Sequence, residues 1–231
     1  EGVVLCHPNR AEALRTYQEV LKNRNKLLKE AYEPNFDAKV LRVYTDQLID
    51  ASNSVGEAYN DFLRVFGPEF SSTLSQMTDG KHKGHVEIQE SPIFLRCAHE
   101  TAEAMDARDM AAGTTVAGPH RIDLSIFLDE HSIQSWASQG QNRLIVIALK
   151  VALLRLVADL RVCEPVLLLD DVSSELDQNL SDLLTDYLGH QGGQVLATTT
   201  SAEAVGFSGD EVARFVVQEG RIVRVLDGVG D

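Results

Sequence analysis

The sequence predicts an α/β protein in two parts: a helical lobe over residues 1–112, and a parallel sheet with flanking helices over residues 113–231. Long stretches of the first part repeat apolar residues at helical spacing. In the second part a strongly apolar helix pattern is followed by a short buried-strand pattern that ends on two aspartates. We therefore expect the chemistry of the chain to lie in the second part.

The stretch before the apolar helix suits a phosphate. From Leu144 to Leu160 apolar residues fall on nearly every side, as in a helix enclosed by other elements. The preceding Ser138-Gln139-Gly140-Gln141 has small and amide side chains, so backbone N–H groups and the positive end of the helix dipole can face a phosphate. An ordinary capped helix with Ser138 as N-cap is the alternative.

Two adjacent carboxylates follow the buried strand. The apolar run at residues 166–169 predicts a central strand of a parallel sheet covered on both faces. Ligands of such sheets bind outside the carboxyl ends of the strands, where Asp170 and Asp171 stand. Neighbouring carboxylates repel unless a cation or a catalytic task compensates, so one aspartate would serve Mg²⁺ and the other a water molecule. A turn in which both only cap the chain from Val172 onward is the alternative.

These motifs resemble the signature loop, Walker B strand and D-loop of ABC-type ATPase heads, and more closely those of the RecF branch of SMC-like ATPases. The resemblance rests on SQGQ at residues 138–141, LLLDDV at residues 167–172 and SELD at residues 174–177. Transporter ATPases typically have a glutamate in place of Asp171. Upstream, residues 118–124 are similar to the family's GPHRDDL, with Ile122 in place of the first aspartate.

The resemblance implies the C-terminal half of an ABC/SMC-like P-loop ATPase head, with a helical arm lobe, and an ATP site shared by two copies of the chain. Asp170 would help hold Mg²⁺, and Asp171 would position the attacking water. The start of the apolar helix would touch the γ-phosphate of ATP held by a second protomer. The residues implied to bind nucleotide are Ser138, Gln139, Gly140, Gln141, Ser174, Asp177 and Thr199. Thr199 lies in a threonine run where relatives have a switch residue, commonly histidine.

The loop that cradles ATP phosphates in P-loop enzymes, G-x-x-x-x-G-K-[ST], does not occur in the sequence. The nearest string, at residues 79–82, lacks the first glycine and the hydroxyl after lysine. We therefore expect the C-terminal part of a longer protein, which alone would not hydrolyse ATP. Two alternatives remain open: another SMC-like ATPase, and an interaction module that dimerises through its arm without turning over ATP.

Composition bears on partners and compartment. The net charge is −14, and from residue 113 onward eight Lys and Arg stand against 17 Asp and Glu. Contact with DNA would therefore need local basic patches or parts outside the chain. The lack of a membrane-length apolar stretch and the three widely spaced cysteines favour a soluble, cytoplasmic protein. The resemblance implies three partners: a second copy of the chain, duplex or gapped DNA, and a RecR-like mediator. It also implies that the complete protein assists recombinase loading at gaps.

The first part predicts two long antiparallel helices. One covers residues 9–30 and carries a basic side, either solvated or in contact with DNA, formed by Lys22, Arg24, Lys26 and Lys29. The other covers residues 37–66 and is ended by Gly67-Pro68. Residues 97–112 predict a third helix, ended by Gly113, with an acidic face formed by Glu100, Glu103, Asp106 and Asp109.

Shorter elements complete the prediction. Strands are expected at residues 86–89, 93–95, 114–117, 125–128 and 195–197, a turn at 78–80, a helix at 178–188, and a closing hairpin of residues 215–218 and 221–225. Arg121 is expected to pair with Asp123, with phosphate contact as the alternative. A zinc site is a weaker hypothesis, because the spacing of its candidate ligands matches no standard pair. Those candidates are His82, His85, Cys97 and His99.

Overall fold

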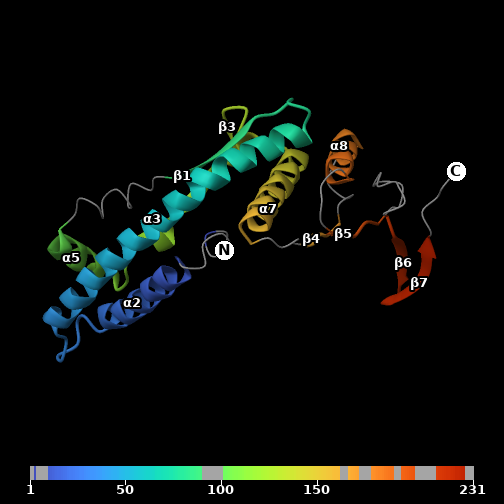
Figure 1. Ribbon diagram of the computed structural model, residues 1–231. Helices are drawn as coiled ribbons and strands as arrows, with labels where there is room; N and C mark the ends of the chain where they lie inside the picture. The colour runs from blue at the N-terminus through green and yellow to red at the C-terminus, as the bar shows by residue number, and fades with distance from the viewer. Residues whose placement is uncertain are drawn as a thin grey trace. The chain divides into compact units, whose positions relative to one another are not determined.

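The computed structural model describes residue 3 and residues 10–89, 101–161, 166–171, 178–189, 194–200 and 212–226 (Figure 1). The chain divides into two compact units, residues 1–69 with 85–127 and residues 70–84 with 128–231. Helices dominate the first unit, whereas the second contains a parallel strand pair and its helices. The predicted division into an arm lobe and a head portion stays a prediction.

The first unit is built on an antiparallel helix pair. Helix α2 (Ala11–Lys29) lies alongside the first part of α3 (Ala38–Met77), as Figure 1 shows. Near the start of α2, Arg10 bonds Asp61 at 2.8 Å, and near its end Arg24 bonds Thr45 at 2.9 Å. The two helices therefore run in opposite directions, as predicted. Between these points Tyr17 packs in one core cluster with residues 48, 51 and 55.

Helix α3 passes through Gly67 and Pro68, so the predicted end of this helix is wrong. A proline inside a helix removes one backbone hydrogen bond and costs about 3 kcal/mol. The side chains that follow continue the buried stripe, because Phe70, Leu74 and Met77 are each 0% exposed. Burying each contributes about 1.5–3 kcal/mol, which outweighs the proline penalty.

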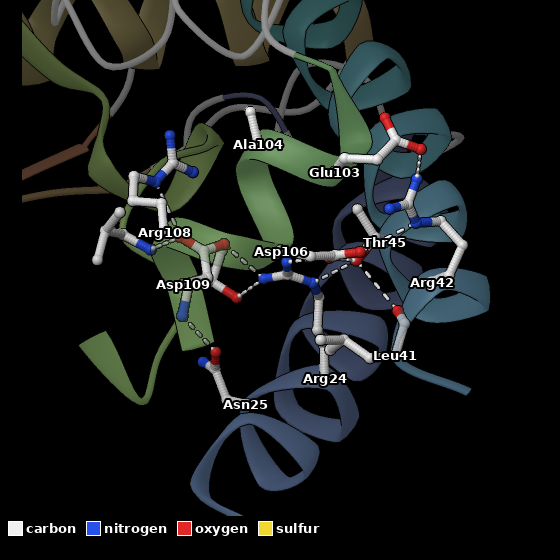
Figure 2. A network of polar contacts seen from close by, with 12 residues as sticks. Arg24, Asn25, Leu41, Arg42, Thr45, Glu103, Ala104, Asp106, Arg108 and Asp109 are labelled. Carbon is white, nitrogen blue, oxygen red and sulfur yellow. Dashed lines mark hydrogen bonds and ion pairs between the residues drawn. The ribbon is translucent and has the colours of Figure 1, made fainter. Parts of the chain in front are cut away.

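Arg24 is fully buried, which overturns its predicted place on an exposed basic face. Figure 2 shows its guanidinium between two carboxylates of α5 (Ala102–Ala112). Nη1 lies 2.6 Å from Asp109 Oδ2, and Nη2 lies 3.1 Å from Asp106 Oδ1. Nε donates to Thr45 Oγ1 on α3, and Nη1 also donates to Thr115 Oγ1 at 2.7 Å. One side chain therefore joins three helices and the loop after the third.

Two more arginines complete the network and correct the predicted acidic face of α5. Arg42 Nε lies 2.9 Å from Asp106 Oδ2, and Arg108 Nε lies 3.0 Å from Asp109 Oδ1. Arg42 also contacts Glu103, at 2.5 Å. The pKa of Glu103 is lowered, first by a hydrogen bond from its own backbone N–H and then by Arg42. Asp106 and Asp109 are thus buried ion-pair partners rather than a solvated face, and Glu100 lies outside the described residues.

Residues 114–117 do not form the predicted strand. Two of their backbone donors bond to side chains of helices instead of to a neighbouring strand. The N–H of Thr115 donates to Asn25 Oδ1 at 2.8 Å, and the N–H of Val116 donates to Asp109 Oδ1 at 3.3 Å. The segment leaves α5 through Gly113, which has the left-handed φ of 66° that a helix-ending glycine adopts.

A small sheet joins β1 (Gly84–Gln89), β2 (Asp123–Leu128) and β3 (His131–Ser132) in the order β1-β2-β3. It confirms the strands predicted at 86–89 and 125–128, and the predicted turn at 78–80 is also present. The strand predicted at 93–95 lies outside the described residues.

The second unit holds the parallel pair. After the short α6 (Ile133–Trp136) come α7 (Gln139–Arg161), β4 (Val166–Leu169), α8 (Gln178–Gly189) and β5 (Gln194–Ala197). β4 pairs with β5 in parallel, with Leu169 opposite Ala197. The helix predicted at 178–188 is confirmed.

One face of β4 is open, which corrects the prediction of a strand covered on both faces. Leu167 and Leu169 are buried, whereas Val166 and Leu168 are 45% and 64% exposed. The apolar run correctly located a strand, but in the described part of the chain only alternate side chains find cover. Helix α7 contacts β4 and supplies part of that cover.

The chain closes with the predicted hairpin, β6 (Arg214–Gln218) and β7 (Arg221–Leu226). Its two turn residues, Glu219 and Gly220, have φ values of 48° and 75°. Positive φ at both positions matches the twist of an antiparallel pair. In the ranges described above, no helix has the length and apolarity needed to cross a bilayer.

The Arg24 network generates a stability prediction. Replacing Arg24 by alanine leaves Asp106 and Asp109 buried without their shared cation, so we expect the free energy of unfolding to fall by about 3–5 kcal/mol. The exposed Lys22, on the same helix, is the matched control. Lys22→Ala should change the free energy of unfolding by less than about 0.5 kcal/mol. Urea denaturation followed by circular dichroism measures both. Equal effects of the two substitutions would contradict the importance of the network.

Candidate functional site

The start of α7 is closed by reciprocal hydrogen bonds. The backbone N–H of Ser138 donates to Gln141 Oε1 at 3.0 Å, and the N–H of Gln141 donates to Ser138 Oγ at 3.2 Å. This is a capping box, in which the N-cap and N3 side chains satisfy each other's backbone donors. The alternative predicted for this stretch, a helix capped by Ser138, is therefore confirmed as its local structure.

The capping box leaves part of the helix end available. It uses the N–H groups of Ser138 and Gln141, and the N–H of Asn142 bonds the Ser138 carbonyl at 2.9 Å. The N–H groups of Gln139 and Gly140 take no part in these bonds, and Gln139 is exposed. Donors in the first turn of a long helix suit an anion, so the cap is compatible with the predicted phosphate contact.

The two aspartates stand directly after β4 in a tight turn. Asp170 is exposed, and Asp171 has a left-handed φ of 48°, which is uncommon for a residue other than glycine. Thr198, which follows the neighbouring strand β5, fixes this turn from one side. Its Oγ1 donates to Asp170 Oδ1 at 2.5 Å and accepts from the N–H of Asp171 at 2.8 Å. The backbone N–H of Thr198 donates to the Leu169 carbonyl at 2.9 Å.

Arg143 of α7 reaches the same turn from the other side. Its Nη2 donates to the carbonyl of Asp170 at 2.6 Å and also to the carbonyl of Asp171. Gln139 of the helix start and Asp170 line the same groove, which has a volume of about 380 Å³. The groove is lined by Gln139, Asn142, Arg143, Val146, Ile147, Lys150, Leu169 and Asp170.

The groove has the groups that a phosphate with a divalent cation would need. Arg143 and Lys150 supply positive charge, and Asp170 supplies a carboxylate. Among the described residues no cluster of three or more His, Cys, Asp or Glu is arranged to hold a metal. A Mg²⁺ ion at Asp170 would therefore complete its shell with water and phosphate oxygens, as this ion usually does.

Sequence reasoning located some of these residues and missed others. Gln139 of the predicted helix start and Asp170 of the aspartate pair both line the groove, and the roles given to them stay predictions. In the threonine run it selected Thr199 as a nucleotide contact, which stays a prediction, and it did not select Thr198, which bonds both aspartates. It missed Arg143. A single arginine in the first turns of a strongly apolar helix was the feature that could have indicated a polar contact there. Ser174 and Asp177 lie outside the described residues.

The Gly118–Arg121 segment is a short 3-10 turn in the other unit, with its helical residues at Pro119–Arg121. Gly118 has φ 141°, and a Cβ there would come within 2.7 Å of the Tyr17 hydroxyl, so only glycine fits. His120 Nε2 faces the Thr115 carbonyl at 3.3 Å and must therefore carry the proton. Nδ1 then accepts from the Tyr17 hydroxyl at 2.5 Å. His120 thus ties this segment to α2.

The expected ion pair between Arg121 and Asp123 is not formed among the described residues. Asp123 Oδ1 instead accepts from the N–H of Leu124 at 2.8 Å, because an aspartate readily bonds the next backbone donor. The zinc hypothesis also gains no support. His82 Nδ1 lies 2.6 Å from Asp129 Oδ2 and His85 stacks on Phe127, while Cys97 and His99 lie outside the described residues.

Comparison with known proteins places these features in context. No protein-family model matches the chain. The DNA replication and repair protein RecF of Oceanobacillus iheyensis is 34% identical over 232 residues, which cover 94% of this chain and 59% of that protein. The same-named protein of Citrifermentans bemidjiense is 33% identical over 235 residues, covering 98% and 61%. The chain is similar to RecF. It spans about 60% of the length of these RecF proteins.

The solved structures of RecF agree on the fold. A recombination mediator protein RecF with ATP superposes with a TM-score of 0.69 at 23% identity, covering 99% of this chain and 61% of the RecF chain. A second structure, described as RecF-ATPrS, gives 0.68 at 24% identity, covering 97% and 60%. These similarities show that the chain shares the fold of the RecF structures, and they confirm the predicted α/β class with parallel strands and flanking helices.

His120 generates a pH prediction. Burial lowers the pKa of His120 below its ordinary 6.5, and the nearby Arg121 lowers it further, against opposing effects of the Thr115 carbonyl and Asp109. The unfolded chain therefore binds the proton more readily, so stability is full above about pH 6.5 and falls as the pH drops below it. The lowered pKa values of Glu103 and Asp129 place their titration below this window.

We expect His120→Asn to flatten this part of the curve of unfolding free energy against pH, because the amide oxygen can accept from Tyr17 without titrating. Thermal unfolding between pH 7.5 and 5.5 measures the effect, and His131→Asn, at an exposed histidine in the other unit, is the control. An unchanged pH dependence in His120→Asn would show that His120 is not its source.

Proposed function

We propose that this chain is the C-terminal portion of a RecF-like ATPase of DNA repair, in which two protomers bind ATP and Mg²⁺ between their heads. The observation that carries the proposal is that Gln139 of the SQGQ helix start and Asp170 line one groove, and that Arg143 of the same helix bonds the carbonyls of both aspartates. The similarity to RecF supports the assignment of both motifs to nucleotide chemistry.

Each side chain has a role in this proposal. Asp170 holds Mg²⁺ together with water and the phosphates, and the metal supplies charge neutralisation of the transferred phosphoryl group. Asp171 orients the attacking water and accepts its hydrogen bond, so that ATP and water give ADP and phosphate. Ser138 and the N–H groups of Gln139 and Gly140 contact the γ-phosphate of ATP held by the partner. Gln141, Ser174, Asp177 and Thr199 complete the nucleotide contacts.

We also propose the wider RecF role: binding of duplex or gapped DNA in the cytoplasm, action with a RecR-like mediator and recombinase loading at gaps. The names of the relatives support this assignment. The net charge of −14 means that DNA contact must use local basic groups. On α2 the exposed lysines 22, 26 and 29 remain such groups, whereas Arg24 is committed to the buried network.

A non-hydrolysing interaction module is the second candidate. The observation that favours it is the antiparallel pair of the long helices α2 and α3. In that case the groove would bind no nucleotide, and the helical pair of α2 and α3 would carry the association. The two candidates differ in whether the aspartates matter for turnover.

Substitution of each aspartate decides between the two candidates. The experiment uses the complete protein, which carries this sequence together with the phosphate-binding loop G-x-x-x-x-G-K-[ST], called Walker A. We expect Asp171→Asn to lower kcat by at least about 100-fold with the ATP Kd unchanged within about twofold, because the water loses its base but the nucleotide keeps its contacts. Asp170→Asn should instead weaken Mg²⁺-dependent binding. Phosphate release and fluorescent-nucleotide titration measure these quantities. A wild-type protein that neither binds nor hydrolyses ATP would refute the ATPase proposal and leave the interaction module as the remaining candidate.

Ser138 allows capping to be separated from phosphate contact. Aspartate caps a helix as well as serine does, so Ser138→Asp should leave the melting temperature unchanged. Its added negative charge would repel the γ-phosphate, and we expect ATP-dependent dimerisation and turnover to be lost. Ser138→Ala is the opposite control, expected to cost about 1 kcal/mol of stability while adding no charge. Full turnover in Ser138→Asp would argue against a phosphate at this helix start.

A further inference from the structure

We infer that Arg143 is a positioning residue that fixes the Asp171 turn and makes its geometry depend on the ligand at the start of α7. The inference rests on the proposed function, and it adds a residue that links the two halves of the site. The geometry that carries it is a pair of hydrogen bonds from one guanidinium nitrogen to two consecutive carbonyls, those of Asp170 and Asp171.

The backbone at Asp171 needs such support. Its left-handed φ of 48° is a conformation that costs a residue with a side chain on the order of 1 kcal/mol or more. Arg143 holds the carbonyl before Asp171 and the carbonyl of Asp171 itself, while Thr198 holds the N–H between them at 2.8 Å. The peptide groups on both sides of Asp171 are therefore fixed by side chains from two different elements, α7 and the end of β5.

Arg143 also supplies charge at this point. Asp170 and Asp171 are adjacent carboxylates, and like charges at such separation repel. A permanently charged guanidinium bonded to both of their carbonyls offsets that repulsion before any cation arrives. Lysine carries the same charge, but its side chain is shorter, and its ammonium group has no plane that fixes the directions of two N–H groups on one nitrogen.

The position of Arg143 on α7 links the ligand at the helix start to the turn at Asp171. Arg143 lies one turn after Gln139, and both line the same groove. The capping box fixes the helix start as one rigid turn, so a displacement of Ser138 or Gly140 by a ligand moves Arg143 with it. In a dimer, the helix start faces ATP held by the partner, whereas Asp171 serves ATP held by its own head. Arg143 then makes hydrolysis in one head sensitive to the nucleotide of the other.

The test uses the complete protein with its Walker A loop. We expect Arg143→Lys, which keeps the charge in the groove, to lower kcat by about 10- to 100-fold with the ATP Kd and the melting temperature close to wild type. Arg143→Gln should lower kcat at least as much, and it should also weaken ATP binding because the charge is lost. Arg155, three turns further along α7, is the matched control. It contacts Gln76 Oε1 at 3.3 Å and the ring of Tyr187, far along the helix from the aspartates, and Arg155→Gln should retain wild-type kcat.

The dependence of turnover on ATP concentration tests the link itself. We expect the wild-type Hill coefficient to exceed 1 and that of Arg143→Lys to fall toward 1, because the link through Arg143 is lost although each ATP still contacts both heads. Wild-type kcat and Hill coefficient in Arg143→Lys would overturn the inference, as would equal losses of kcat, ATP affinity and melting temperature in both variants. If the wild-type protein itself did not hydrolyse ATP, the proposed function would fail instead, so the two failures are distinguishable.

Discussion

The turn at Asp170 and Asp171 depends on side chains that approach it from both sides. A strand that ends in two carboxylates has no intrinsic reason to hold them in one orientation, and Asp171 adopts a backbone conformation that is unfavourable on its own. Thr198 and Arg143 together contact the N–H, both carbonyls and one carboxylate oxygen of this dipeptide. The parallel pairing of β4 with β5 is what brings Thr198 within reach.

The helical unit uses the same principle in its interior. Burying an arginine with two aspartates is not a strong source of stability, because desolvation of the charges offsets most of their attraction. Its value lies in geometry: Arg24 has donors for α3, α5 and the loop after α5 at once, and a shifted helix would leave a buried charge unsatisfied. The network therefore specifies one arrangement of three helices.

The sequence predicted the elements that have a regular pattern or a stop residue. The antiparallel helix pair, the third helix ended by Gly113, the parallel strand with its aspartates and the closing hairpin are all present. The resemblance of SQGQ and LLLDDV to RecF motifs selected Gln139 and Asp170, which line one groove, while their roles toward nucleotide stay predictions. The predictions that proved wrong concerned features that depend on tertiary contacts. Periodicity alone did not show that Phe70 and Met77 would carry a helix through Pro68, or that Arg24 would find two buried carboxylates.

The open face of β4 and β5 has a consequence for how the chain behaves in solution. Val166, Leu168 and Leu196 expose 45%, 64% and 52% of their surface on two adjacent strands, a row that favours self-association. The acidity that weakens attraction to DNA opposes this, because molecules of net charge −14 repel one another. That repulsion has a range of roughly 10 Å at 0.1 M salt and about 3 Å at 1 M. Colloidal stability of this chain therefore falls as ionic strength rises, so dilute salt is the better medium for handling it.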